Sequence, residues 1–172
     1  MNAPPASALP PALTEMLEPG ERPLALWRPS LLKFAEQFLV IGLVTSAMFV
    51  LAFPGLWLLW LPATPVLILA WGFVFDDWRR WALRRHDHWL LTDRRLIFFN
   101  PDEATPPAAV PLARIARPVA LSWLSVGLVL DTGARLSLKY LRHPGKVRTR
   151  IFSAKANLQE ATDDTDRLGR HP

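Results

Sequence analysis

Two adjacent carboxylates, Asp76 and Asp77, are the first residues of this chain whose types could perform chemistry. Paired carboxylates can transfer protons in general acid–base catalysis or bind a divalent metal ion. Arg79 and Arg80 follow them at the spacing of about one helical turn, and an ion pair along a helix explains the aspartates more simply. We therefore interpret them as partners of these arginines, and a membrane enzyme that uses them is the remote alternative.

A second cluster consists of His86 and His88 on either side of Asp87. In a strand the two imidazoles would lie on one face, where two nitrogens and a carboxylate could bind zinc. No further ligand lies nearby in the sequence, because His143 is distant and His171 is close to the C-terminus. The cluster is more typical of a solvated linker, so we expect no metal site and no cofactor.

The remaining sequence lacks the motifs of nucleophilic and nucleotide chemistry. The 172 residues include no cysteine, and the eight glycines form neither a phosphate-binding loop nor a Gly-x-Ser-x-Gly elbow. The net charge of +5 permits binding to nucleic acid or to anionic membranes. Lys146, Arg148 and Arg150 are basic residues of one segment, but cations on an outer helix face are usually solvated. We expect a protein that is not an enzyme and binds no nucleic acid.

The elements that must position these residues begin with an uncharged block. Residues 37–75 contain no Asp, Glu, Lys, Arg or His. The core of a bilayer is about 30 Å thick and needs about 20 helical residues, so this block is too long for one crossing. Pro54-Gly55 near its middle breaks helices. The pattern predicts a transmembrane hairpin over residues 32–77, with helices over 32–53 and 56–75. A helical hairpin buried in a soluble protein is the alternative.

Cations flank this block and are absent from its turn. Arg22, Arg28 and Lys33 precede or open the first helix. A cluster that we name the collar follows the second helix. Its members are Trp78, Arg79, Arg80, Trp81, Arg84 and Arg85, and we expect Trp89 to extend it. Both termini are therefore predicted to lie in the cytoplasm, as in a multi-pass protein of the bacterial inner membrane. The collar either binds anionic lipid or acts solely as a determinant of this topology.

After the collar the hydrophobic pattern alternates with a period of two, which is typical of strands. Residues 88–92 and 96–100 predict a hairpin joined at Asp93-Arg94. Residues 126–130 and 136–140 predict a second, clearer hairpin around Asp131-Thr132-Gly133.

A helical pattern then begins at Pro144, with an apolar stripe of Val147, Ile151, Ala154 and Leu158. The sequence thus predicts a small antiparallel domain over residues 86–160 that ends in an amphipathic helix. Residues 1–31 would form an N-terminal tail, disordered over 1–12, and a juxtamembrane segment. Residues 161–172 would form a polar tail.

Two motifs on either side of the uncharged block resemble those of bacterial membrane proteins that carry a pleckstrin-homology-like (PH-like) domain. One is Glu18-Pro19-Gly20-Glu21, followed by Arg28-Pro29-Ser30. The other, which is the more specific, is Leu91-Thr92-Asp93-Arg94-Arg95-Leu96-Ile97. Val110-Pro111-Leu112 and Leu141-Arg142-His143-Pro144 continue the match, which extends to about Leu158. The resemblance implies a small, strongly bent β-barrel or sandwich capped by the C-terminal helix, without catalytic residues.

This resemblance adds Arg94 and Arg95 to the candidate residues for binding lipid or a partner. The range 86–160 is short for such a domain, so either one strand is missing or residues 24–27 supply it. We expect a membrane-anchored α+β protein that presents its PH-like domain to a protein partner, to a second copy or to the lipid surface. The alternative is an accessory subunit of a transporter or envelope complex, with small residues for helix packing. These residues are Gly42, Thr45, Ser46 and Ala47.

Overall fold

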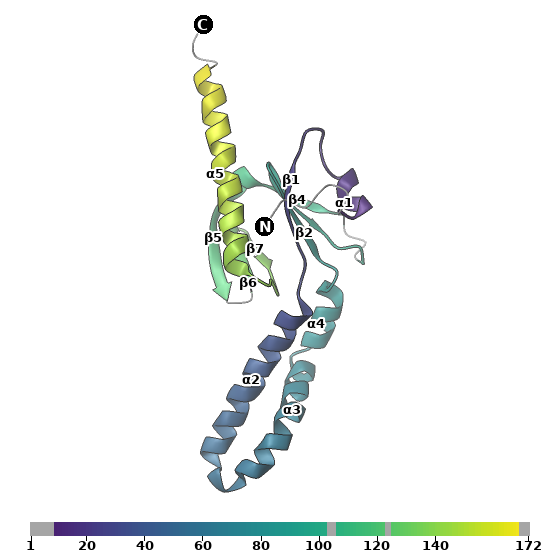
Figure 1. Ribbon diagram of the computed structural model, residues 1–172, viewed down its shortest axis with the longest axis vertical. Coiled ribbons are helices and arrows are strands. Elements are labelled where there is room, and N and C mark those ends of the chain that lie inside the picture. Colours follow the sequence, from purple (N-terminus) through teal and green to yellow (C-terminus); the bar gives the residue numbers. More distant parts are fainter. Residues whose placement is uncertain (1–8, 103–105, 123–124, 169–172) are drawn as a thin grey trace. The chain divides into compact units, whose positions relative to one another are not determined.

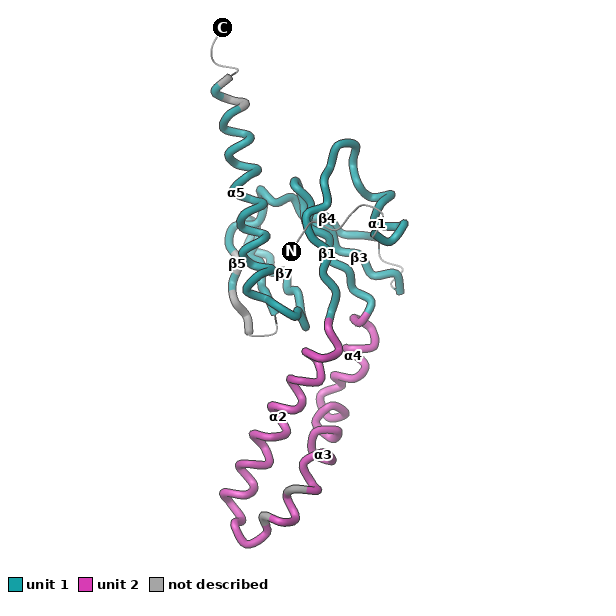
Figure 2. The backbone as a smooth tube through the Cα atoms, viewed as in Figure 1, with its two compact units in different colours: residues 1–29, 86–172 teal, residues 30–85 magenta. Residues whose placement is uncertain are grey.

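The computed structural model describes residues 9–102, 106–122 and 125–168 of the chain. Contacts between residues divide the chain into two compact units, which Figure 2 distinguishes by colour. One unit combines Met1–Pro29 with His86–Pro172, and the other is Ser30–Arg85. We call the first the β-domain and the second the helical unit. The β-domain extends beyond the predicted range 86–160, because the segment before the helices joins it.

Two long apolar helices joined by a tight turn make up most of the helical unit (Figure 1). α2 extends over Leu31–Ala52 and α3 over Trp57–Val74, and the short 3₁₀ helix η2, Pro54–Leu56, connects them. The break lies at the predicted position, because proline disfavours helical geometry in the residue before it, and Phe53 is no longer helical. Pro62 and Pro65, which we expected to kink the second helix or to delay its start, both lie inside α3.

By length and composition, α2 is the one helix in the described part of the chain that could cross a bilayer. Within α3, Pro62–Val74 forms a shorter apolar helical stretch. A core helix of a soluble protein is mostly buried, whereas only 22% of an apolar 18-residue stretch of α2 is buried. Large side chains such as Met48 and Leu51 are 66% and 82% exposed. The structure thus provides one candidate membrane span where the sequence predicted two.

Small residues allow α2 and α3 to approach each other closely. A Cβ atom added at Gly42 would lie 2.1 Å from Cγ1 of Ile68, so glycine is required for this contact. One turn further, the hydroxyl groups of Ser46 and Thr64 are hydrogen-bonded at 2.7 Å. Two of the small residues expected to pack against another subunit are therefore used within the chain itself.

Among the described residues of the β-domain, seven antiparallel strands form two sheets. The first sheet has the order β1, Pro23–Trp27; β2, His88–Thr92; β3, Arg95–Phe99; and β4, Ala108–Pro111. The second has the order β5, Ile115–Ser122; β6, Ser125–Leu130; and β7, Arg135–Leu138. Both predicted hairpins are confirmed as the pairs β2–β3 and β6–β7. The chain is an α+β protein with antiparallel sheets.

The strand β1 comes from the segment before the helical unit and pairs with β2 after it. Pro23 lies opposite Thr92, and Trp27 lies opposite Trp89. The open question about residues 24–27 is thus answered, because they supply a strand.

One apolar core fills the space between the two sheets and the C-terminal helix. The first sheet contributes Trp89, Leu91 and Leu96, and the second contributes Val126 and others. α5, Pro144–Leu168, packs along β6 and the 3₁₀ helix η3, Leu112–Arg114 (Figure 1). The predicted stripe on this helix is confirmed. Its members Val147, Ile151 and Ala154 are buried, and Leu158 packs beside them.

The N-terminal residues before β1 cover the outer face of the first sheet. In α1, Pro11–Glu15, Leu13 is fully buried, and together with Leu9 it packs against Leu90 and Ile97. This explains why β2 buries consecutive residues, since its two faces lie in two different cores. The prediction of a disordered tail over residues 1–12 is wrong from Leu9 onward, and residues 1–8 lie outside the described part.

Two predicted boundaries near the C-terminus also differ. β7 ends at Leu138, because Tyr140 has a φ of 56°, in the left-handed region that interrupts a strand. α5 continues to Leu168 rather than ending near residue 160. Thr and Asp are frequent in this last part and are weak helix formers, but Asp164 and Arg167 lie one helical turn apart and pair at 4.0 Å. Residues 169–172 of the predicted tail lie outside the described part.

Candidate functional site: a basic groove

The two motifs of the PH-like resemblance meet in a cluster that we name the clasp: Glu18, Glu21, Thr92 and Arg95. The carboxylate of Glu21, whose side chain is 0% exposed, accepts hydrogen bonds from Nε and Nη2 of Arg95 at 2.9 and 2.8 Å. It also accepts the hydroxyl of Thr92 at 2.7 Å and the backbone N–H of Glu18 at 2.9 Å. Arg95 in turn pairs with Glu18 at 2.9 Å and donates to the carbonyl of Met16.

The electrostatics of the clasp keep Glu21 ionised. Burial raises the pKa of Glu21, but the hydrogen bonds from Arg95, the Glu18 backbone and Thr92 lower it further, so its pKa lies below 4.5. The hydrogen bond with Glu21 raises the pKa of Arg95 despite burial. Arg95, a candidate binding residue, therefore holds the fold together. Arg94 is 52% exposed and lies 3.8 Å from Glu18, so it is the more accessible of the two.

Most of the collar lies in a short amphipathic helix of the helical unit, which is separate from α3. α4 extends over Asp77–Arg84 and is separated from α3 by Phe75 and Asp76, and the φ of Asp76, 54°, is left-handed. Trp81 stacks on Phe34 with ring centroids 4.7 Å apart, and Trp78 stacks on Phe38 at 5.8 Å. The tryptophans thus pack against α2.

The cations of the collar remain on the surface. Arg79 and Arg80 are 77% and 63% exposed at the side chain, and Arg84 and Arg85 are also exposed. Arg79 lies 4.0 Å from Asp76, and Arg80 lies 3.9 Å from Asp77, so the predicted local pairing of the two aspartates is confirmed. Such exposed pairs contribute little to stability, and the collar presents its charge to its surroundings.

The histidine cluster is divided among separate local contacts. His86 hydrogen-bonds to Asp102, and His88 hydrogen-bonds to the backbone carbonyl of His86. Asp87 is buried and accepts a hydrogen bond from Asn100 at 2.9 Å. Burial, together with the nearby charge of Arg28, lowers the pKa of His88. Within the described residues, no group of three or more His, Cys, Asp and Glu side chains is arranged to hold a metal ion.

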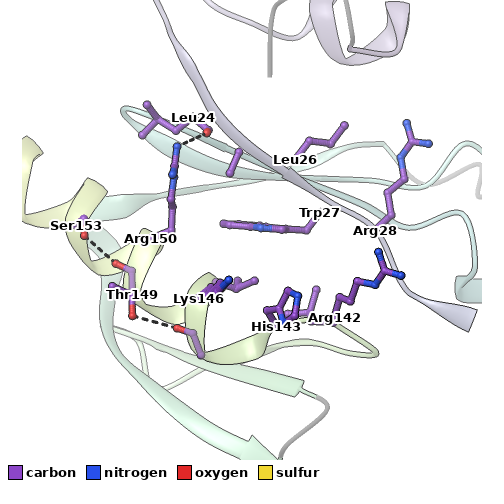
Figure 3. A pocket seen from close by; sticks show the side chains of 14 residues that line it. Leu24, Leu26, Trp27, Arg28, Arg142, His143, Lys146, Thr149, Arg150 and Ser153 are labelled. Atoms are coloured by element: carbon purple, nitrogen blue, oxygen red, sulfur yellow. Dashed lines mark hydrogen bonds between the residues drawn. The ribbon is translucent and has the colours of Figure 1, made fainter. Parts of the chain in front are cut away.

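A concave groove of about 1030 Å³ lies between β1 and the start of α5 (Figure 3). One wall is β1 from Leu24 onward, and the other is the first turns of α5 with the segment that precedes them. The indole of Trp27 lies across the middle of the groove in Figure 3. The walls are held together by Arg150, which donates a hydrogen bond from Nη2 to the carbonyl of Leu24 at 3.0 Å.

Basic side chains line this groove from both walls. They are Arg28, Arg142, His143, Lys146 and Arg150. In Figure 3 the guanidinium groups of Arg28 and Arg142 extend to the same end.

No aspartate or glutamate is among the described residues that line the groove. Arg28, Arg142 and Lys146 are exposed, and none of them makes an ion pair with a described carboxylate. The first turn of α5 adds the positive end of a helix dipole. These positive charges repel one another, and a bound anion would reduce this repulsion because each of the cations attracts it.

The basic residues of this groove were noted in the sequence, but the sequence did not predict that they lie close together in space. Arg28 was interpreted as a determinant of topology, and Lys146 and Arg150 as an outer, solvated helix face. The structure places Lys146 and Arg150 beside β1 instead. The missing information was the pairing of β1 with β2, which brings Arg28 to residues far away in the sequence. A signal was available in the position of Arg28, directly after the possible strand of residues 24–27, and of Arg142, two residues before the predicted helix at Pro144.

Comparison with known proteins provides no further constraint, because no protein-family model and no curated protein matches this sequence.

Proposed function

We propose that this chain is a membrane-anchored binding protein without enzymatic activity, whose β-domain binds an anionic ligand in the basic groove. One observation carries this proposal: four cations and a histidine converge on a concave surface without a described carboxylate among them. A concave site lined by charges of one sign concentrates ligands of the other sign.

The membrane anchor would be the helical unit. α2 has the length and composition of a membrane span, and its large side chains are exposed along most of its length. α3 has 18 residues and would return the chain to the same side, as in the two-helix hairpin expected from the sequence. The exposed cations of the collar would then lie at the cytoplasmic headgroups, because cations accumulate on that side.

The PH-like character of the β-domain is supported by its motifs and by its architecture. The clasp joins the two motifs on which the resemblance depends, Glu18–Glu21 and Leu91–Ile97. The two antiparallel sheets enclose one core, which α5 closes, as expected for a bent barrel or sandwich capped by a helix. The contacts of Asp76, Asp77, His86 and His88 with their neighbours favour a binding role over the alternative of a membrane enzyme.

The anchor predicts the location of the C-terminus. With two crossings and cations on both flanks, both termini would lie in the cytoplasm. A reporter enzyme fused after Pro172 should be active in its cytosolic form and inactive in its periplasmic form. Replacing the four collar arginines by glutamine should weaken this preference. A reporter that is active in the periplasm would contradict the hairpin.

The groove is tested with the full chain in a neutral maltoside detergent. A fluorescent polyglutamate peptide serves as a generic anionic probe, and its anisotropy is measured at increasing salt. The groove variant is Arg142→Gln with Lys146→Gln. The control variant is Arg135→Gln with Arg148→Gln, two exposed arginines of the same domain that do not line the groove.

Each double variant lowers the net charge from +5 to +3. The wild-type chain and the control variant should bind the peptide at low salt, and the groove variant should bind it markedly less. Equal losses in the two variants would mean that the net charge alone attracts the probe, and the proposed site would be wrong.

A further inference from the structure

The groove is tied to the membrane by a very short piece of chain. Arg28, at one end of the groove, is followed by Pro29 and Ser30 and then by Leu31, the first residue of α2. Three residues of extended chain span at most about 10 Å. This limit holds for any orientation of the β-domain relative to the helical unit. If α2 crosses the membrane, which is part of the proposed function, Arg28 cannot leave the neighbourhood of the bilayer surface.

The charges at the start of α2 indicate where that surface would lie. Lys33 and Glu36 form an ion pair, and the uncharged stretch begins at Gln37. Charged residues stay in the headgroup layer, because a bilayer core solvates them poorly. Arg28 is therefore close in sequence to the level of the phosphates. Electrostatic attraction extends about 8 Å at physiological salt, so the groove end at Arg28 is within range of anionic headgroups.

The side chains of the groove suit a phosphate group. Guanidinium groups bind phosphate oxygens through two parallel hydrogen bonds, and lysine binds phosphate as a point charge. Arg28 and Arg142 extend to the same end of the groove, and Lys146 lines the groove from α5 (Figure 3). Trp27 adds an indole, whose apolar ring with one donor is favoured at the boundary between headgroups and acyl chains.

We propose that the basic groove binds the phosphate headgroup of an anionic phospholipid in the membrane that holds the chain. A short tether makes this ligand continuously available, because tethering raises the effective concentration of a nearby partner. A soluble acidic protein would need higher intrinsic affinity to compete. Binding would hold the end of β1 and the start of α5 against the bilayer and so fix the orientation of the β-domain.

The test uses the full chain in maltoside micelles that contain equal amounts of phosphatidylglycerol and phosphatidylcholine. Native mass spectrometry counts the phospholipids that each chain retains. The groove variant Arg142→Gln/Lys146→Gln is compared with the control variant Arg135→Gln/Arg148→Gln. Two further samples contain glycerol 1-phosphate or the polyglutamate peptide as competitors. Thermal melts of both variants verify that they are folded.

The wild-type chain and the control variant should retain phosphatidylglycerol in preference to phosphatidylcholine. The groove variant should lose about 30-fold in affinity for phosphatidylglycerol, the effect of two cations near an anionic surface. Glycerol 1-phosphate should compete weakly, because it is not held at the micelle surface.

Three outcomes would overturn the inference. Undiminished retention by a folded groove variant would place the lipid elsewhere, for example at the collar. Glycerol 1-phosphate that binds as tightly as the lipid would identify a soluble phosphate compound as the ligand. Displacement of all lipid by polyglutamate at low concentration would favour an acidic protein as the ligand, in which case the basic groove would remain an anion-binding site but not a lipid site.

Discussion

The clasp and the basic groove lie in the same β-domain, and both are rich in cations, but their charges have different surroundings. In the clasp, Arg95 faces two glutamates, one of which is completely buried. In the groove, Arg28, Arg142 and Lys146 are exposed and face no described carboxylate. The comparison teaches that a cation's partner, rather than its motif, separates a structural role from a binding role. Arg95 belongs to the most specific motif of the sequence, and its guanidinium group is held by Glu18 and Glu21.

The largest expected effect concerns the helix that forms one wall of the groove. Ile151 is 1% exposed and belongs to the central core, so Ile151→Ala should lower the free energy of unfolding by about 2–5 kcal/mol. Arg148→Ala, an exposed residue of the same helix, should change it by about 0.5 kcal/mol or less. Thermal and denaturant unfolding of the full chain in detergent measure both. Similar losses in the two variants would mean that α5 does not close the core.

Breaking the clasp should have the next largest effect. Arg95→Met leaves the buried carboxylate of Glu21 without its main partner, which should cost about 3 kcal/mol, the lower end for a broken buried pair, because Arg95 is still 21% exposed. Arg94→Met is the matched control, since its exposed pair with Glu18 contributes about 0–1 kcal/mol. If unfolding experiments give equal and small losses for both, the distinction between the clasp and the groove fails.

A smaller effect should appear at acid pH. Because the pKa of Glu21 is lower in the folded state than its ordinary value of 4.5, its ionised form stabilises the fold above pH 4.5. This contribution is lost as the pH falls through the folded-state pKa. The difference in melting temperature between the wild type and Glu21→Gln should therefore be constant from about pH 5 to 7. It should shrink below about pH 4.5, where carboxylates become protonated. A difference independent of pH would exclude an ionised Glu21 as the source.

The sequence predicted the elements of this fold that depend on local patterns. The hairpin β6–β7 and the stripe Val147, Ile151 and Ala154 follow from a period of two and a period of 3.6, which side-chain directions impose within each element. The turn at Pro54 follows from the chemistry of proline. These features require no knowledge of what lies beside the element.

The features that the sequence did not predict depend on contacts between distant segments. Leu13 packs against Leu90, but the whole helical unit separates these two residues in the sequence. The N-terminal segment was therefore interpreted as a tail. Glu21 meets Arg95, and the motif containing Arg95 indicated a binding residue where the structure has a buried ion pair. Arg150 was expected on an outer face, but its guanidinium group reaches the backbone of β1. The pattern of charges along one helix or strand does not reveal which group of a distant segment will contact those charges in the folded chain.

The central claim is that the groove cations serve a ligand rather than the fold. The most direct test is the melting temperature of the full chain in maltoside micelles, with and without phosphatidylglycerol. A ligand that binds the folded state raises the melting temperature, so the wild type should be stabilised by the lipid. The groove variant Arg142→Gln/Lys146→Gln should melt like the wild type without lipid and gain no stability with it. A groove variant that is already destabilised without lipid, or that gains as much stability as the wild type, would contradict the account.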